Sequence, residues 1–153
     1  MAAFRLSGRP VRPHTPEVRH SLYVHIVWVT RDRAPLIDAT IAEFLWRYMR
    51  QVAAQERAQV LAGGLLTTHV HLLVRLHPVT SISKLLQRLK GGSSVLASKE
   101  GHAPVDRPLR WAKGYSIHSV SHRALPNVTE YVRRQNERHP QEAIPGWRGG
   151  FAA

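Results

Sequence analysis

Four segments of the chain carry the apolar pattern of β-strands. They are rich in β-branched and aromatic residues, and in the first of them the apolar positions alternate with a period of two. The segments are residues 20–30, 59–68, 69–76 and 111–121. In the first strand, one face comprises Leu22, Val24, Ile26 and Trp28, and the other comprises Tyr23, His25, Val27 and Val29.

The boundary between the second and third strands contains small and hydroxyl residues. Gly63–Gly64 predicts a bulge or bend within the second strand, because glycine weakens a regular strand. Thr67–Thr68 marks a tight reversal, after which the third strand opens with His69.

Apolar residues at helical spacing predict a helix after the first strand and another after the third. The first helix spans residues 37–58 and begins near Asp38. The second begins at residues 80–90, is interrupted by the Gly-Gly-Ser-Ser sequence at 91–94, and resumes as far as Lys99. We interpret the interruption as a kink.

A last helix is predicted near the end of the chain. Asn127 and Glu130 have the spacing of a capping box, which would start the helix at Asn127. The helix then runs to about Arg138, and Pro140 closes it. The resulting domain covers residues 20–140, between a basic N-terminal arm at 1–19 and a loose C-terminal tail at 141–153.

The expected order of elements is β-α-β-β-α-β-α. Its first six elements are those of a ferredoxin-like split βαβ fold. We therefore predict an α+β protein with one antiparallel sheet, helices on one face of it, and an additional C-terminal helix that carries Tyr131. Many functions use this fold, so function has to be argued from a site.

The charge of the chain narrows the class of partner. Its 153 residues contain 22 Lys and Arg against 10 Asp and Glu, a net charge of +12. Such an excess favours a polyanion such as nucleic acid over an anionic membrane surface. The sequence has no Cys, which excludes disulfides, thiolate zinc sites and a Cys nucleophile. With no bilayer-spanning run and no signal peptide, we expect a cytoplasmic, nucleoid-associated protein.

Candidate chemistry lies in the third strand and the last helix. His69 and His71 are two residues apart, so a strand points both imidazoles to one face, as a divalent-metal site requires. Tyr131 and Gln135 are four apart and share a helix face. The predicted helix start would put Tyr131 near the positive end of the helix dipole. Two incidental histidines, a packed Tyr and a Gln bonded to backbone are the simpler alternatives.

These residues and their surroundings resemble the single-tyrosine HUH-endonuclease transposases of the insertion-sequence 200/605 type, including the REP-associated tyrosine transposases. The likeness extends over about residues 20–139. It rests on the Thr-Arg-Asp-Arg turn after the first strand, His69-Val-His-Leu-Leu-Val74, Leu89-Lys-Gly-Gly-Ser-Ser94, Trp111-Ala-Lys-Gly-Tyr115 and Tyr131-Val-Arg-Arg-Gln135.

The resemblance implies a DNA strand transferase active in transposition. Tyr131 would be the nucleophile, and His69, His71 and Gln135 would bind Mg²⁺ or Mn²⁺. The substrate would be single-stranded DNA bearing a hairpin, which is cleaved and rejoined through a covalent phosphotyrosine. The protein would act as a homodimer, and no membrane partner is expected. No nucleotide cofactor is expected, since no phosphate-binding Gly-rich motif with Lys-Ser/Thr occurs. Candidate DNA-binding cations are Lys84, Arg88, Lys90, Lys113 and Arg134.

One position departs from the resemblance. Relatives commonly carry Asp or Asn before the histidine pair, where this chain has Thr68. A hydroxyl is a weaker hydrogen-bond partner for a ligating imidazole than a carboxylate. A non-catalytic DNA-binding protein on the same fold is therefore the leading alternative. A two-histidine phosphoesterase is disfavoured, because the residues two after His69 and His118 are His71 and Val120 instead of Ser or Thr.

Overall fold

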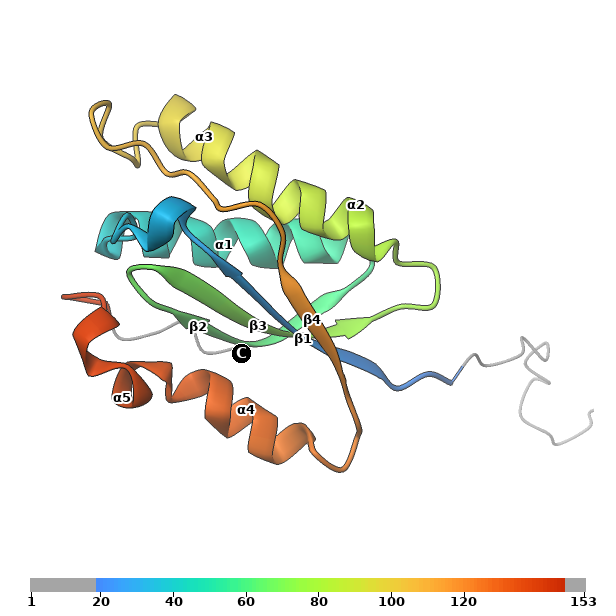
Figure 1. The fold of residues 1–153 in the computed structure, drawn as a ribbon. Coiled ribbons are helices and arrows are strands. Elements are labelled where there is room, and N and C mark those ends of the chain that lie inside the picture. The colour runs from blue at the N-terminus through green and yellow to red at the C-terminus, as the bar shows by residue number, and fades with distance from the viewer. Residues whose placement is uncertain (1–18, 148–153) are drawn as a thin grey trace, which may run out of the picture.

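The fold is a four-stranded antiparallel sheet with helices on both faces. The computed structural model describes residues 19–147. The strands lie in the order β2-β3-β1-β4 (Figure 1). Their bounds are β1 Leu22–Val29, β2 Gln59–Leu65, β3 His69–Leu76 and β4 Ser116–Val120. This order is that of the ferredoxin-like split βαβ fold, so the predicted fold class is confirmed.

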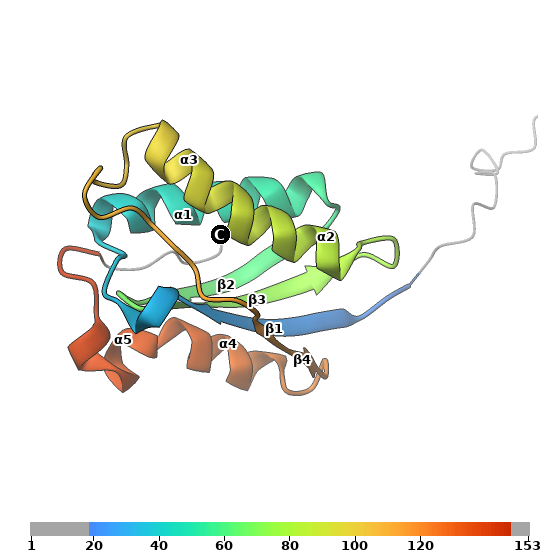
Figure 2. The same ribbon diagram turned by 45° about the horizontal axis from the view of Figure 1, so that its top comes forward.

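One face of the sheet is covered by α1 and by a long helical segment above it. That segment runs through α2, the π-helical η2 and α3 with little change of direction (Figure 2). The bounds are α1 Ala39–Gln55, α2 Ile82–Gln87, η2 Arg88–Gly92 and α3 Ser93–Lys99. The predicted kink at 91–94 is therefore a π-helical turn beginning at Arg88. The Tyr48 hydroxyl donates to the Arg88 carbonyl at 2.8 Å, which satisfies a backbone acceptor in this turn.

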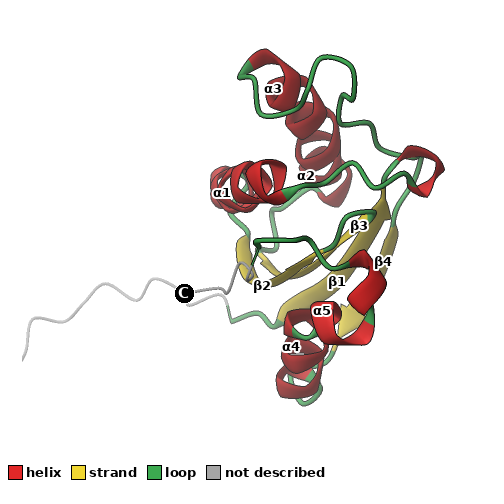
Figure 3. Ribbon diagram, turned by 90° about the vertical axis from the view of Figure 1, so that its left-hand side faces the viewer, coloured by secondary structure: helices red, strands yellow, loops and turns green. Residues whose placement is uncertain are grey.

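The opposite face is covered by α4, Leu125–Arg133, and the short α5, Gln135–Arg138 (Figure 3). The sheet therefore lies between two helical layers. Among residues 19–147, no helix is long and apolar enough to cross a membrane.

The main core lies between the sheet and α1, because strand alternation places apolar residues on that face. Ile26 and Trp28 of β1 and Val70 and Leu72 of β3 are at most 1% exposed there. The N-terminus of α1 lies where the sequence predicts it: Asp38 is the N-cap, and its carboxylate accepts the Ile41 N–H at 2.9 Å.

Three strands are shorter than predicted: β1 covers Leu22–Val29 of the expected 20–30, β2 ends at Leu65 instead of residue 68, and β4 covers only part of 111–121. The register shift of β2 lies between Val60 and Ala62, so the predicted bulge at Gly63–Gly64 is wrong. The fourth strand begins at Ser116 instead of residue 111, because Trp111 forms only an isolated bridge with Thr30.

The predicted capping box at Asn127 is wrong as well. The α4 helix begins at Leu125 with Pro126 in its first turn, where the missing proline N–H costs no hydrogen bond. It ends at Arg133, so Tyr131 lies in its last turn and not near its positive end. The expected dipole contribution to Tyr131 is therefore absent.

The predicted loose tail is wrong for residues 141–147. A 3-10 turn, η3, spans Pro140–Glu142, and the Thr67 N–H donates to the Glu142 carbonyl at 2.9 Å. Ile144 then enters the main core at 3% exposure. Burial of Ile144 and the hydrogen bond between the Thr67 N–H and the Glu142 carbonyl hold this segment against the β2–β3 turn. The rest of the predicted tail, 148–153, and residues 1–18 of the predicted arm lie outside the described residues.

Candidate active site

The two histidines of β3 project from the sheet face that α4 and α5 cover. His69 and His71 are 5% and 6% exposed, and their ring centroids lie 5.0 Å apart. Val70 and Leu72 point into the main core on the other side. The alternation predicted from the sequence is confirmed, and it places both imidazoles in the buried layer between the sheet and the helices α4 and α5.

The α4 helix brings Tyr131 to the same face. Its buried Val132 packs in a small apolar cluster with Leu73 of β3, and this contact fixes the height of the helix over the sheet. The Tyr131 ring lies edge-on to His71, with the ring centroids 6.0 Å apart. Arg138 of α5 places its guanidinium carbon 4.5 Å from the centre of the Tyr131 ring. The Tyr131 ring therefore has both an imidazole and a guanidinium as neighbours.

Gln135 completes the group. It is fully buried, and its amide nitrogen donates to the Tyr131 carbonyl at 2.9 Å. That bond fixes which way the amide faces and leaves its oxygen free to point elsewhere. The helix breaks at Arg134, just before Gln135, yet Gln135 and Tyr131 remain neighbours through this hydrogen bond.

A glycine lets Gln135 come this close to the sheet. Gly64 of β2 pairs directly with His71. A Cβ atom on Gly64 would overlap the Val132 carbonyl oxygen and lie 2.9 Å from the Gln135 Cγ. The pair Gly63–Gly64 thus signals close approach of a helix rather than the bulge that we expected.

Two buried polar atoms of this group, a ring nitrogen and an amide oxygen, have no hydrogen-bond partner. Among the described residues, five buried side-chain nitrogen or oxygen atoms lack one, and two of the five are His71 Nε2 and Gln135 Oε1. Unsatisfied buried donors and acceptors are costly, so each needs an explanation. Neutral imidazole nitrogen and amide oxygen are both metal ligands. No cluster of three His, Cys, Asp or Glu with metal-binding geometry occurs in residues 19–147, so a site here depends on the amide.

His71 has a second histidine behind it. Its Nδ1 lies 3.0 Å from His25 Nε2 of β1, and the two rings stack. Burial lowers the pKa of His71 to about 3, and the neighbouring His69 and His25 act in the same direction. Burial likewise lowers the pKa of His25. Both rings are therefore neutral at pH 7, the form in which imidazole can bind a metal.

His69 is held by a hydroxyl and, through it, by a carboxylate. Its Nδ1 lies 2.9 Å from the Thr68 hydroxyl, which donates to Glu142 Oε1 at 2.5 Å. Burial lowers the pKa of His69, and Glu142 opposes that effect. The Thr68 hydrogen bond in turn holds the pKa of Glu142 below its usual value.

Three predicted DNA-binding cations lie across the sheet from the histidines. Lys84 Nζ and Arg88 Nη1 approach the same Glu56 oxygen, at 3.6 and 3.0 Å. Lys90 donates to the carbonyls of Ala112 and Gly114, at 2.9 and 2.6 Å, and so anchors that loop. Each cation therefore has a structural task, and its role in DNA binding stays a prediction.

The other two predicted cations are exposed. Lys113 lies in the loop before β4. Arg134 separates α4 from α5, beside Gln135, and its Nε lies 3.3 Å from Glu130. Of the five, Arg134 is adjacent in sequence to a residue of the site. Its contact with DNA also stays a prediction.

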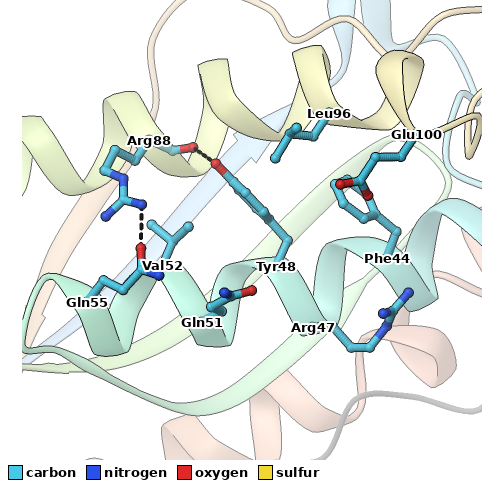
Figure 4. A pocket seen from close by; sticks show the side chains of 9 residues that line it. All are labelled: Phe44, Arg47, Tyr48, Gln51, Val52, Gln55, Arg88, Leu96 and Glu100. Atoms are coloured by element: carbon cyan, nitrogen blue, oxygen red, sulfur yellow. Dashed lines mark hydrogen bonds between the residues drawn. The ribbon is translucent and has the colours of Figure 1, made fainter.

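A pocket of about 400 Å³ lies between α1 and the α2–α3 segment, away from the histidines (Figure 4). Two of its polar side chains already have partners: the Tyr48 hydroxyl bonds the Arg88 carbonyl, and the Arg88 guanidinium bonds Gln55 and Glu56. The two buried polar atoms without partners, His71 Nε2 and Gln135 Oε1, lie on the other face of the sheet, so we place the candidate site there.

Sequence reasoning missed His25, Glu142 and Arg138. Alternation did put His25 on the correct face of β1, but only the register of β1 against β3 brings it to His71. Glu142 lay beyond the predicted end of the domain, so nothing in the pattern pointed to it.

Comparison with known proteins places the chain among transposases. A sequence model of the family described as "Transposase IS200 like" matches residues 18–135. The ISDra2 transposase TnpA of Deinococcus radiodurans is 25% identical over 122 residues, which cover 78% of this chain and 87% of that protein. The transposase for insertion sequence element IS200 of Salmonella typhimurium is 22% identical, over 74% and 76% of the two chains.

Solved structures share the fold. A candidate transposase from D. radiodurans superposes with a TM-score of 0.60 at 24% identity, covering 81% of this chain and 97% of that one. A REP-associated tyrosine transposase bound to a REP hairpin gives 0.59 at 15% identity, over 80% and 73%. Because the family match spans most of the described domain, this chain belongs to the IS200-like transposase family.

Proposed function

We propose that this transposase cleaves and rejoins single-stranded DNA by attack of Tyr131 on a phosphodiester, with a divalent cation held by His69, His71 and Gln135. The observation that carries the proposal is the meeting of Tyr131 with two orphaned buried ligand atoms, His71 Nε2 and Gln135 Oε1, on one face of the sheet. A packed, structural Tyr would not account for these two polar atoms without hydrogen-bond partners.

The chemical step is a transesterification. The Tyr131 phenolic oxygen forms a bond to phosphorus, and the bond from phosphorus to one sugar oxygen breaks. The phenol loses its proton and the departing sugar oxygen gains one, so no hydrolysis and no nucleotide is needed. Reversal by another DNA end, with its sugar hydroxyl attacking the phosphotyrosine, rejoins the strand.

The residues around Tyr131 have distinct tasks in this proposal. A bound Mg²⁺ or Mn²⁺ would supply Lewis-acid stabilisation of charge on the phosphate oxygens. Gln135, fixed by its bond to the Tyr131 carbonyl, ties the nucleophile to the ligand set. Arg138, over the Tyr131 ring, meets the phosphate and offsets its negative charge.

If His71 binds the cation through Nε2, its other nitrogen must carry the proton. Nδ1–H then donates to His25 Nε2, which makes His25 the acceptor and orients the His71 ring. This role for His25 follows from the pairing of β1 with β3.

The substrate class draws on charge and on one relative. The chain carries a net charge of +12, and a structural neighbour is bound to a REP hairpin. We therefore infer that hairpin-bearing single-stranded DNA is the substrate here too. A homodimer stays a prediction, which the mass from light scattering will test.

Covalent capture tests the function. Single-stranded DNA hairpins labelled at the 3′ or the 5′ end are incubated with the protein and Mn²⁺, then resolved under denaturing conditions. We expect a labelled protein band that Tyr131→Phe abolishes while hairpin binding persists. The label that is retained also gives the polarity of cleavage.

The alternative is a DNA-binding protein on the same fold that does not cleave. A wild-type protein that binds hairpins but forms no adduct with Mn²⁺ would establish it. Adduct formation by Tyr131→Phe would instead move the nucleophile to another residue.

A further inference from the structure

Three side chains from separate segments form a short hydrogen-bonded line to His69. Glu142 ends η3, Thr68 lies in the turn between β2 and β3, and His69 opens β3. Thr68 Oγ1 is 2.5 Å from Glu142 Oε1 and 2.9 Å from His69 Nδ1. Glu142 Oε1 itself is 3.9 Å from His69 Nδ1, so the contact runs through the hydroxyl.

The direction of these bonds follows from the number of protons available. A carboxylate only accepts hydrogen bonds, so the single Thr68 hydroxyl proton must point to Glu142. The Thr68 oxygen then has only lone pairs to offer His69. The proton of the second bond must therefore come from His69, on Nδ1.

We propose that Glu142 is a positioning residue that acts through Thr68 to hold His69 as the Nδ1–H tautomer, with Nε2 free to bind a cation. The role of that cation rests on the proposed function, but the tautomer does not. Without the carboxylate, the Thr68 hydroxyl could turn its proton toward Nδ1, and His69 would then present an N–H where a lone pair is needed.

Glu142 is held in place independently of the side chains that it orients. Its carbonyl accepts the Thr67 N–H at 2.9 Å, and Ile144 anchors the following segment in the main core. Its second oxygen lies 3.7 Å from His139 Nδ1. The η3 turn is therefore held against the β2–β3 turn, and it places the Glu142 carboxylate beside Thr68, although the two residues are 74 apart in the sequence.

The tautomer can be read directly by NMR in the metal-free protein. Long-range proton–nitrogen correlations distinguish Nδ1–H from Nε2–H imidazole, and a His69→Gln variant assigns the signal. We expect the Nδ1–H pattern for His69 in the wild type. Glu142→Ala and Thr68→Val should each lose it, and Thr68→Ser, which keeps the hydroxyl, should retain it.

Cation binding gives a second readout. Titration with Mn²⁺ alone should show about tenfold weaker binding for Glu142→Ala and Thr68→Val, the scale typical of removing an outer hydrogen-bond partner of a ligand. Glu137→Ala removes the same charge from an exposed site on α5 and serves as the matched control, with wild-type affinity expected.

Two results would overturn the proposal: an Nε2–H pattern for His69 in the wild type, or Nδ1–H signals and Mn²⁺ binding unchanged in both Glu142→Ala and Thr68→Val. If Glu142→Ala unfolds, Thr68→Val, which keeps the side-chain shape, decides alone. Failure of the proposed function is separate, since it appears as the absence of a DNA adduct in the wild type.

Discussion

The two faces of the sheet do different work with the same strands. The face toward α1 is almost wholly apolar, and it contains most of the buried side chains among residues 19–147. The face toward α4 has a small apolar cluster with four buried members, Ala62, Leu73, Val120 and Val132. Beside that cluster lie the buried polar side chains His69, His71 and Gln135.

This difference separates stability from chemistry. Burying apolar surface stabilises the fold, whereas burying an unsatisfied imidazole or amide costs free energy. The α1 face provides most of the stabilisation by apolar burial, and the α4 face contains the buried polar groups that cost free energy. Changes on the two faces should therefore be separable by measuring unfolding and DNA cleavage on the same variants.

The largest expected effect is on the α4 face and is purely chemical. Tyr131→Phe removes the nucleophilic oxygen, so adduct formation should fall at least about a thousandfold. Tyr131 is only partly buried, so the unfolding midpoint in urea should stay close to that of the wild type. A large drop in that midpoint would mean that the hydroxyl also supports the fold.

The next effect compares two adjacent, fully buried leucines of β3 that face opposite ways. Leu72 lies in the main core and Leu73 in the small cluster. Leu72→Ala should lower the free energy of unfolding by about 2–5 kcal/mol, because a tightly packed core leaves a cavity. Leu73→Ala should cost less, since α4 can settle toward the sheet. Equal losses, measured by urea unfolding, would contradict the contrast between the faces.

Two adjacent glycines of β2 sharpen the comparison. A Cβ on Gly63 would overlap the Trp46 ring of α1, while one on Gly64 would overlap the Val132 carbonyl of α4. Each change to Ala should cost about 1–3 kcal/mol by overpacking. Only Gly64→Ala should also slow adduct formation, by about a hundredfold, because it displaces Gln135.

Cleavage kinetics on the folded fraction of both glycine variants provide the measurement, with each as the other's control. If Gly63→Ala cleaves as slowly as Gly64→Ala at equal stability, then a change packed against α1 also disturbs the site on the α4 face, and the contrast between the two faces fails.

The last effect, the smallest for each unit of the change applied, is the pH dependence of the metal-free protein. The unfolded chain protonates His71 near pH 6.5, but burial lowers its folded pKa to about 3. Between those values the unfolded state binds more protons than the folded state. The free energy of unfolding therefore decreases as the pH is lowered, by about 1 kcal/mol per pH unit. The lowered pKa values of His69 and Glu142 act in the same direction, with Glu142 contributing below its unfolded value.

Urea unfolding in a chelating buffer from pH 7 to 4 measures this slope, and His71→Asn should reduce it. A wild-type stability that does not change over that range would show that the histidines are not buried as neutral rings.

The ligand set and nucleophile were within reach of sequence reasoning because their spacing is local. Alternation in a strand puts His69 and His71 together, and a helical turn puts Tyr131 and Gln135 together, whatever the rest of the chain does. The same reasoning failed at Asn127, where the proline just before it starts the helix earlier and moves Tyr131 to the last turn.

Thr68 illustrates what local reasoning could not supply. By itself its hydroxyl is a weak partner for His69, and the sequence offered no carboxylate nearby. The structure brings one from residue 142, through a turn that was predicted to be loose.

The sequence by itself determined the order of strands and helices, which residues of β1 share a face, and the two local pairs of candidate residues, since these depend on periods of two and 3.6 residues. Only the tertiary structure decided that His25 lies behind His71, that Gly64 admits Gln135 and that Glu142 reaches Thr68. Those contacts depend on strand register and on the packing of segments far apart in the chain, which no local periodicity encodes.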